Sequence, residues 1–156
     1  MTGVAGDHVI TIEESDDEAA FAQVRLAWIE EDDGRPVDDA GFAAEFSRWW
    51  TAERDHRRMW LARIGERPVG MLNLIMIDHM PRPGRAHSWW GYLSHLYVLP
   101  AERNAGIGGM LIAACVEQAR TAGMSRIVLH PAERARPLYA RAGFAVTDDL
   151  LVLPLA

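Results

Sequence analysis

The residues best suited to bind a charged group form a glycine-rich segment: Arg103, Asn104, Ala105, Gly106, Ile107, Gly108 and Gly109. An apolar run at 96–99 precedes this segment and predicts a strand, and the pattern over 110–122 predicts a helix. A strand that leads through such a turn into a helix leaves unpaired backbone N–H groups at the positive end of the helix dipole. Glycine also lets the main chain approach an oxygen-rich ligand closely. The segment therefore predicts an anion site, and we expect it to bind a pyrophosphate.

Two common phosphate-binding loops do not fit this segment. A P-loop needs a Lys and then Ser or Thr after its last glycine, whereas Met110 and Leu111 follow Gly109. A dinucleotide-binding fingerprint needs a Gly or Ala where Leu111 stands and an acidic residue about twenty positions later. Residues 126–130 read Arg-Ile-Val-Leu-His instead. Both classes of nucleotide site are therefore excluded.

The composition is that of one ordinary globular domain, which we expect to span residues 1–156. No apolar run approaches the about eighteen residues of a membrane span, and the first residues lack a signal pattern, so we expect a cytoplasmic protein without membrane contact. The single cysteine, Cys115, excludes an internal disulfide and a clustered metal site, so no metal is expected. A net charge of −6 disfavours nucleic acid and suits a cationic substrate.

Apolar periodicity predicts alternating helices and strands along the whole chain. Helices are expected after a Ser15–Glu18 capping box, near 39–55, from 109 to 122 and from 136 to 142. Strands are expected at 9–12, 59–64, 69–77, 91–99, 127–129, 144–146 and 150–155. The second helix should bury Phe42, Phe46 and Trp49, and Trp50 should widen that face. This order predicts an α/β or α+β layered domain with long helices crossing a mixed sheet.

Three segments, in this order along the chain, resemble the GNAT-type (acyl-CoA-dependent) N-acetyltransferase superfamily. Arg67-Pro68-Val69-Gly70 is similar to the hairpin that opens the third strand of that family. The strand at 96–100 and the glycine-rich segment resemble its pantetheine strand and pyrophosphate loop, and 138–144 resembles its Leu-Tyr-x-x-x-Gly-Phe motif. The resemblance covers nearly the whole chain. It implies a mixed, mostly antiparallel sheet of about seven strands flanked by about four helices.

The resemblance also implies which residues bind acetyl-CoA as the co-substrate. Backbone groups of 96–98 would hold the pantetheine arm as an added strand does, and those of 103–108 would hold the pyrophosphate, with Arg103 or Arg136 near a phosphate. The chain departs from the family at Ala132, where many members carry an Asn that contacts the cofactor. The expected cofactor-binding residues are Leu96, Tyr97, Val98, Arg103, Asn104, Ala105, Gly106, Ile107, Gly108, Gly109 and Arg136.

Acetyl transfer to an amine needs a proton for the departing thiolate and a neutral attacking amine. Tyr139 resembles the general acid of the family, and packing against the cofactor is the alternative role for its ring. His95, an imidazole one residue before the pantetheine segment, is the best candidate for the base. A structural histidine is the alternative, as is a water chain that ends at Glu30 or Glu31. His130 ranks below His95.

The sequence therefore predicts an enzyme that acetylates a primary amine by direct attack in a ternary complex. The acceptor would be a small molecule or a peptide N-terminus, and Glu30 and Glu31 would favour a cationic one if they lie at its entrance; a solvated helix end is the alternative. The other hypotheses are a non-catalytic module that senses acyl-CoA and a transferase that uses another acyl-CoA or a hydroxyl acceptor. Tryptophans at 49, 50, 89 and 90 are compatible with a core or with a homodimer interface.

Overall fold

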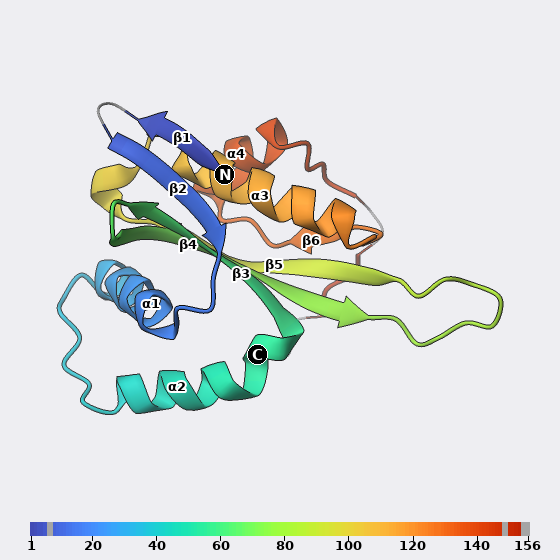
Figure 1. The fold of residues 1–156 in the computed structure, drawn as a ribbon, viewed down its shortest axis with the longest axis horizontal. Helices are drawn as coiled ribbons and strands as arrows, with labels where there is room; N and C mark the ends of the chain where they lie inside the picture. The colour runs from blue at the N-terminus through green and yellow to red at the C-terminus, as the bar shows by residue number, and fades with distance from the viewer. Residues whose placement is uncertain (6–7, 148–149, 154–156) are drawn as a thin grey trace.

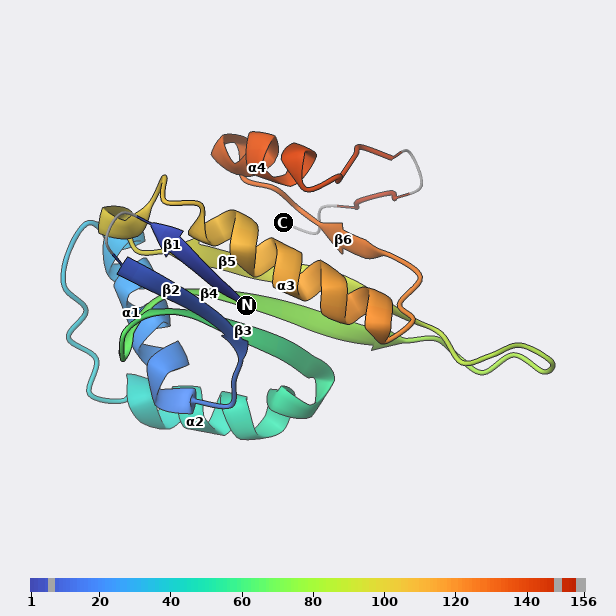
Figure 2. The same ribbon diagram turned by 45° about the horizontal axis from the view of Figure 1, so that its top comes forward.

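A computed structural model of the chain describes residues 1–5, 8–147 and 150–153. A sheet lies between two layers of helices, with α1 and α2 on one face and α3 and α4 on the other (Figures 1 and 2). The strands are β1 (Thr2–Ala5), β2 (His8–Glu14), β3 (Arg57–Ile64), β4 (Arg67–Asp78), β5 (Trp89–Val98) and β6 (Ile127–Leu129). The helices are α1 (Glu18–Asp33), α2 (Phe42–Glu53), α3 (Ile107–Thr121) and α4 (Arg136–Arg141), with 3₁₀ turns η1 (Arg54–His56), η2 (Pro100–Glu102) and η3 (Glu133–Ala135).

The sheet is mixed and mostly antiparallel, as the sequence predicts. Its order is β1-β2-β3-β4-β5-β6, in which the first five strands are antiparallel neighbours and β6 runs parallel to β5. The described part of the chain contains six strands rather than about seven, and four α-helices as expected. The fold class is therefore confirmed with a corrected strand count.

The correction in strand number has two parts. The sequence gives no strong signal for β1, which nevertheless pairs with β2 at the edge of the sheet. The final strand pair predicted at 144–146 and 150–155 is wrong where the structure describes it, because 144–147 and 150–153 form no strand. The remaining positions of that prediction, 154 and 155, lie outside the described residues.

The start of α1 is capped by a different residue from the one predicted. Asp17 is the N-cap, and its Oδ1 accepts a hydrogen bond from the Ala20 N–H at 3.0 Å. Ser15 cannot take that role because its own N–H donates to the Met59 carbonyl at 3.0 Å, which keeps it alongside β3. Arg63 also donates to Asp17 at 2.6 Å and fixes the cap in place. The helix therefore begins two residues later than the sequence pattern indicates.

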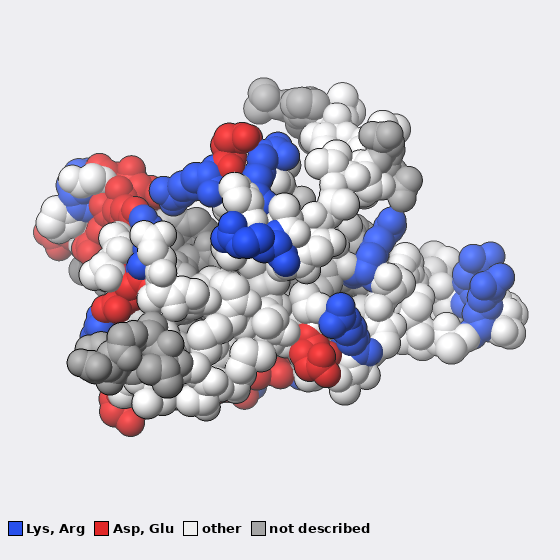
Figure 3. All heavy atoms as spheres, turned by 90° about the horizontal axis from the view of Figure 1, so that it is seen from above, with Lys and Arg blue, Asp and Glu red and all other residues white. Residues whose placement is uncertain are grey.

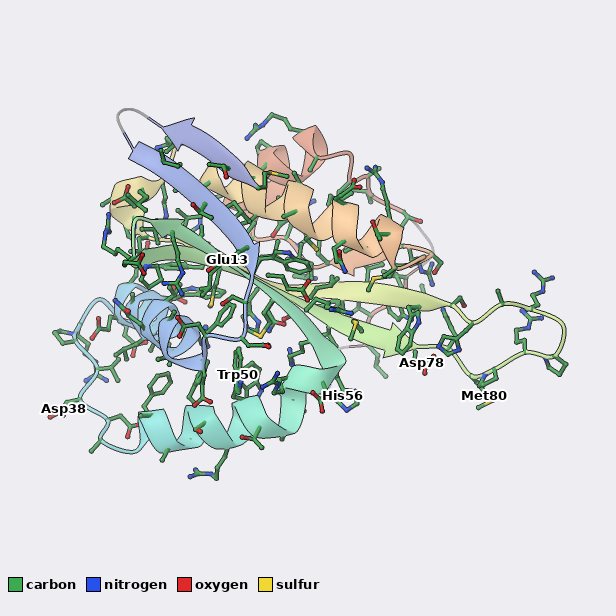
Figure 4. All side chains as sticks on the ribbon, viewed as in Figure 1. Glu13, Asp38, Trp50, His56, Asp78 and Met80 are labelled. Atoms are coloured by element: carbon green, nitrogen blue, oxygen red, sulfur yellow. The ribbon has the colours of Figure 1, made fainter. Side chains whose placement is uncertain are left out.

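The helix α2 packs through Trp50, which lies between the helix and the sheet in Figure 4 and is only 4% exposed. Phe42, Phe46 and Trp49 were predicted to be buried and are half-buried instead. The reason is that these three side chains line a cavity between α1, α2 and the sheet. The prediction identified the correct helix face but not the space in front of it.

An arm projects from the sheet where β4 and β5 continue past their neighbours (Figure 1). The connection at its tip carries Arg82 and Arg85, both exposed, and they give the tip its basic surface in Figure 3. His87 Nε2 lies 2.8 Å from Asp78 Oδ1 across the base of this connection. Among the described residues, no helix has both the length and the hydropathy needed to cross a membrane.

Candidate functional site

The site forms where β5 loses one of its two neighbours. β4 pairs with β5 from Asp78↔Trp89 to Gly70↔Val98, whereas β6 pairs with it only at three positions, which end at Leu93↔Leu129. A bulge at Ser94 shifts the β4–β5 register at the same point. From there to Val98, the edge of β5 that faces away from β4 has no strand partner among the described residues.

Two hydrogen bonds fix which main-chain groups face that open edge. The Leu99 N–H donates to the Val69 carbonyl of β4 at 2.9 Å, and the Val98 carbonyl accepts from Arg103 at 3.0 Å on the other side. Because successive residues of a strand direct their main-chain groups to opposite sides, Leu96 and Val98 present theirs to the open edge. An extended ligand could add there as a further strand would.

The glycine-rich loop continues from the end of that edge into α3. Asn104 and Gly106 have positive φ angles of 66° and 81°, and Gly106 is the N-cap of the helix. The first helical hydrogen bond is Met110 N–H to the Gly106 carbonyl. Within the described parts of the chain, the N–H groups of 104–109 have no acceptor. They form a concentrated set of free donors at the positive end of a fifteen-residue helix.

The open edge and the loop border one cavity of about 530 Å³, a volume typical of small-molecule sites. Arg103 lines it, as do Arg134 and Arg141, two arginines that no sequence motif marked as cofactor-binding. Arg136 lies outside this lining, and its Nε donates to Glu133 at 2.7 Å. The expected cofactor-binding residues that line the cavity are Leu96, Tyr97, Val98, Arg103, Asn104, Gly106, Ile107, Gly108 and Gly109.

Arg103 holds the loop to the end of α1. Its terminal nitrogens donate to both oxygens of Glu31, at 2.8 and 2.6 Å, and its Nε donates to Val98. The Tyr97 hydroxyl donates to the same carboxylate at 2.8 Å. These donors, Arg103 first, lower the pKa of Glu31 to about 2, while burial and the bond to Glu31 raise the pKa of Tyr97 to about 12. All three nitrogens of Arg103 thus already bind protein acceptors.

Tyr139 reaches the first cavity from α4. Its ring is buried, contacts Phe144 edge to face at 5.7 Å between centroids, and lines the cavity with Leu138 and Gly108. Burial raises the pKa of the Tyr139 phenol, so the hydroxyl keeps its proton at neutral pH. Among the described residues the Tyr139 hydroxyl has no hydrogen-bond partner, which leaves it able to donate to a ligand in the cavity.

A second cavity, of about 390 Å³, lies on the opposite face of the sheet under α1 and α2. Its floor is formed by β3, β4 and β5, which contribute Arg57, Met59, Met71, Asn73 and His95. The helices contribute Phe21, Arg25, Ile29, Phe42, Glu45, Phe46 and Trp49. β5 therefore borders both cavities, since His95 lines the second and Leu96, Tyr97 and Val98 line the first.

His95 occupies the floor of the second cavity in a defined hydrogen-bond network. Its Nδ1 lies 2.7 Å from the Ser94 hydroxyl and 3.3 Å from the Asn73 amide nitrogen. Arg57 donates to Asn73 Oδ1, which turns the amide nitrogen of Asn73 toward His95 and makes Nδ1 an acceptor. The network therefore assigns the imidazole proton to Nε2. Burial, then the charges of Arg25 and Arg57, lower the pKa of His95 to about 4.

The remaining sequence candidates lie away from the second cavity. Glu31 is bound to Arg103, and Glu30 Oε1 accepts from the Val37 N–H at 3.1 Å, so neither carboxylate lines the cavity under the helices. His130 is exposed and borders a groove next to α4. The structure therefore brings His95 to the second cavity and Tyr139 to the first.

Comparison with known proteins decides the family. The sequence model of the "Acetyltransferase (GNAT) family" matches residues 20–144 of this chain. These residues include β3 to β6, the glycine-rich loop and Tyr139. The chain belongs to the GNAT acetyltransferase family. The resemblance inferred from the three sequence segments is thereby confirmed.

Individual relatives agree with this family assignment. A glucosamine 6-phosphate N-acetyltransferase of Trypanosoma brucei brucei is 32% identical over 89 residues, and an uncharacterised N-acetyltransferase of Bacillus subtilis is 31% identical over 85. These matches cover 57% and 54% of this chain, and the chain spans 58% and 54% of the two relatives. A predicted acetyltransferase of Clostridium acetobutylicum, crystallised with acetyl-CoA, has the same fold, with a TM-score of 0.71 and 21% identity over 94% of this chain and 96% of that one.

The ion pair between Glu31 and Arg103 should make stability depend on pH. The folded state lowers the pKa of Glu31 from 4.5 to about 2, so the stabilisation is complete above pH 4.5 and is lost as the pH falls toward 2. Urea unfolding at a series of pH values measures the free energy of unfolding of the wild type and of Glu31→Gln. The difference between the two should shrink as the pH falls through this range. In an Arg103→Gln background the same comparison should show a much smaller effect. A difference in unfolding free energy between wild type and Glu31→Gln that stays the same at every pH would contradict the pairing.

Proposed function

We propose that this chain transfers an acetyl group from acetyl-CoA to a primary amine, either a small molecule or a peptide N-terminus. The observation that carries the proposal is the row of free N–H donors at 104–109, directly after the open edge of β5. A pyrophosphate offers the oxygens that such donors need, and the amide groups of a pantetheine arm can pair with an open strand edge. The two features follow each other along one cavity.

The arginines of this cavity divide into two groups in the proposal. Arg134 and Arg141 are exposed and line the cavity, which suits them to contact phosphate oxygens. Arg103 would instead position the loop, because its guanidinium donates hydrogen bonds to Glu31 and Val98. The main-chain donors, rather than Arg103, would then supply the first contacts to the pyrophosphate.

The chemistry we propose is direct attack of the amine on the thioester carbonyl. The nitrogen forms a bond to the carbonyl carbon, the carbon–sulfur bond breaks, and the sulfur leaves with the electron pair of that bond. Tyr139 donates its phenolic proton to the sulfur, which its raised pKa and its place in the cavity support. The amine loses its proton to water, and the phenolate regains one from solvent.

In this proposal His95 is not the general base that the sequence suggested. An imidazole with a pKa of about 4 is neutral at physiological pH but is a poor proton acceptor there. With Nδ1 facing Asn73 and Ser94, the Nε2–H is free to donate. We propose that His95 orients the acceptor by donating a hydrogen bond from Nε2.

Substitution of Gly106 should remove cofactor binding for a local reason. Gly106→Ala places a side chain at a φ of 81° in the middle of the free donors, where the backbone must rotate to relieve strain. Gly123→Ala, at the other end of α3, meets a φ of 68° and, like the first, no atom within 4 Å. Both variants should lose similar stability, whereas only Gly106→Ala should weaken acetyl-CoA binding, by about tenfold or more. Calorimetric titration with acetyl-CoA that gave equal affinities for the two variants would refute the loop assignment.

Loss of the Tyr139 hydroxyl should slow transfer far more than it weakens acetyl-CoA binding. Tyr139→Phe keeps the buried ring and its contact with Phe144 but removes the proton donor. We expect a loss of about a hundredfold to ten-thousandfold in the single-turnover rate at saturating acetyl-CoA. Thiol release followed in a single turnover keeps product release from hiding the effect. A rate within about threefold of wild type, far below the loss expected for a general acid, would mean that the thiolate leaves without help from Tyr139.

A further inference from the structure

The cavity under α1 and α2 has mostly apolar walls. Residues at helical spacing on α1 (Phe21 and Ile29) and on α2 (Phe42, Phe46 and Trp49) point into it, and Met59 and Met71 extend the apolar surface along the sheet. The aromatic side chains of α2 contact each other, with Phe46 5.4 Å from Trp49 between ring centroids. An occupant of this cavity therefore needs an apolar body, preferably flat and aromatic.

Most of the charged groups of this cavity already have partners or face water. Arg57 donates to Glu53 at 2.7 and 3.2 Å and to Asn73 at 3.4 Å, so its charge is balanced by a neighbour. Glu45 is exposed, and water screens its carboxylate. His95 is neutral at physiological pH.

Arg25 is the exception among these groups. It lies on the same face of α1 as Phe21 and Ile29 and is half-buried in the cavity wall. Its guanidinium stacks over Trp28 at 4.9 Å from the ring centroid. Within residues 1–5, 8–147 and 150–153, it makes no ion pair and no hydrogen bond. An Arg held over an aromatic ring with its donors unused is a ready partner for a planar anion.

Arg25 lies close to the side chains of β5 that border the two cavities. Trp28, under the guanidinium, also stacks on Tyr97 at 5.2 Å and contacts His95 edge to face at 5.5 Å. Arg25 is therefore about one aromatic side chain away from the two β5 residues that border the cavities. A small acceptor bound to Arg25 can still place its amine near His95 and the end of β5.

We propose that the acceptor is a primary amine with one carboxylate and an aromatic or branched apolar body, and that Arg25 binds the carboxylate. The chemistry is that of an apolar α-amino acid. This inference rests on the proposed acetyl transfer and names its substrate class and a residue that determines specificity. It replaces the purely cationic acceptor that the acidic end of α1 indicates in the sequence, because Glu30 and Glu31 are bound elsewhere.

The same features disfavour a phosphorylated sugar amine. A phosphate dianion brings a second negative charge that the single free guanidinium leaves unneutralised, and sugar hydroxyls would meet apolar walls without hydrogen-bond partners. One carboxylate matches one planar guanidinium, and an aromatic body matches the walls formed by α2. Glucosamine 6-phosphate is therefore a suitable negative probe.

The test compares three amines on the full chain: phenylalanine, phenethylamine, which lacks only the carboxylate, and glucosamine 6-phosphate. Thiol release at saturating acetyl-CoA gives kcat and KM, and calorimetry gives acetyl-CoA affinity without any acceptor. The wild type should use phenylalanine with a KM about tenfold to a hundredfold below that of phenethylamine, the effect expected of one charge-assisted bond. It should use glucosamine 6-phosphate least well.

Variants at Arg25 isolate the carboxylate contact. Arg25→Gln should raise the KM for phenylalanine by about tenfold to a hundredfold and leave that for phenethylamine within about threefold, while Arg25→Lys should restore part of the discrimination. Arg48→Gln, on the exposed side of α2 and outside the cavity lining, is the matched control and should change neither value.

Several outcomes would overturn this inference. They are equal or better use of phenethylamine by the wild type, preference for glucosamine 6-phosphate, no use of any of the three amines despite acetyl-CoA binding, or an Arg25→Gln effect that is the same for both aromatic amines. Failure to bind acetyl-CoA at all would instead refute the proposed function, so the two failures are distinguishable.

Discussion

The site depends on the unequal pairing of β5. On one side β4 accompanies this strand along its whole length, and on the other β6 leaves it after Leu93, where the bulge at Ser94 begins. Main-chain groups that lose a partner in a folded protein must find another acceptor or donor, and here the free groups border a cavity. The parting of these two strands thus converts an ordinary sheet into a surface that can bind an extended ligand.

The alternation of side chains along β5 separates the two halves of the proposed reaction. Leu96 and Val98 pack with the apolar cluster under α3, while Tyr97 belongs to the cluster under α1 and α2. His95 shares the side of Tyr97, two residues away, as strand geometry requires. One strand can therefore present its edge to a cofactor and one of its faces to an acceptor.

The network of Glu31, Tyr97 and Arg103 connects these two halves. It joins the last turn of α1, a helix whose earlier turns border the cavity under α1 and α2, to the loop that carries the free N–H donors. The pair is bidentate and partly shielded from water, which is the geometry in which an ion pair contributes most. The position of the loop and the position of α1 are thereby set together.

Local signals in the sequence were sufficient for the elements around the loop. The strand before it, the glycines at 106 and 108, α3 and its stop at Gly123 all follow from the conformational needs of neighbouring residues. The contacts of Glu31 and the isolation of Arg25 could not be predicted in the same way. The first joins residues 72 positions apart, and the second depends on which carboxylates the fold brings near. The N-cap at Asp17 was missed for the same reason, since Arg63 on a distant strand helps to select it.

The central claim is that acetyl-CoA lies along the open edge of β5 and over the start of α3. Amide hydrogen exchange, measured by NMR with and without acetyl-CoA, tests it residue by residue. The account predicts that the ligand slows exchange at the N–H groups of Leu96, Val98 and 104–109, with little change at the cavity-facing turns of α1 and α2. Unchanged exchange at that edge and loop, or slowing confined to α1 and α2, would contradict it.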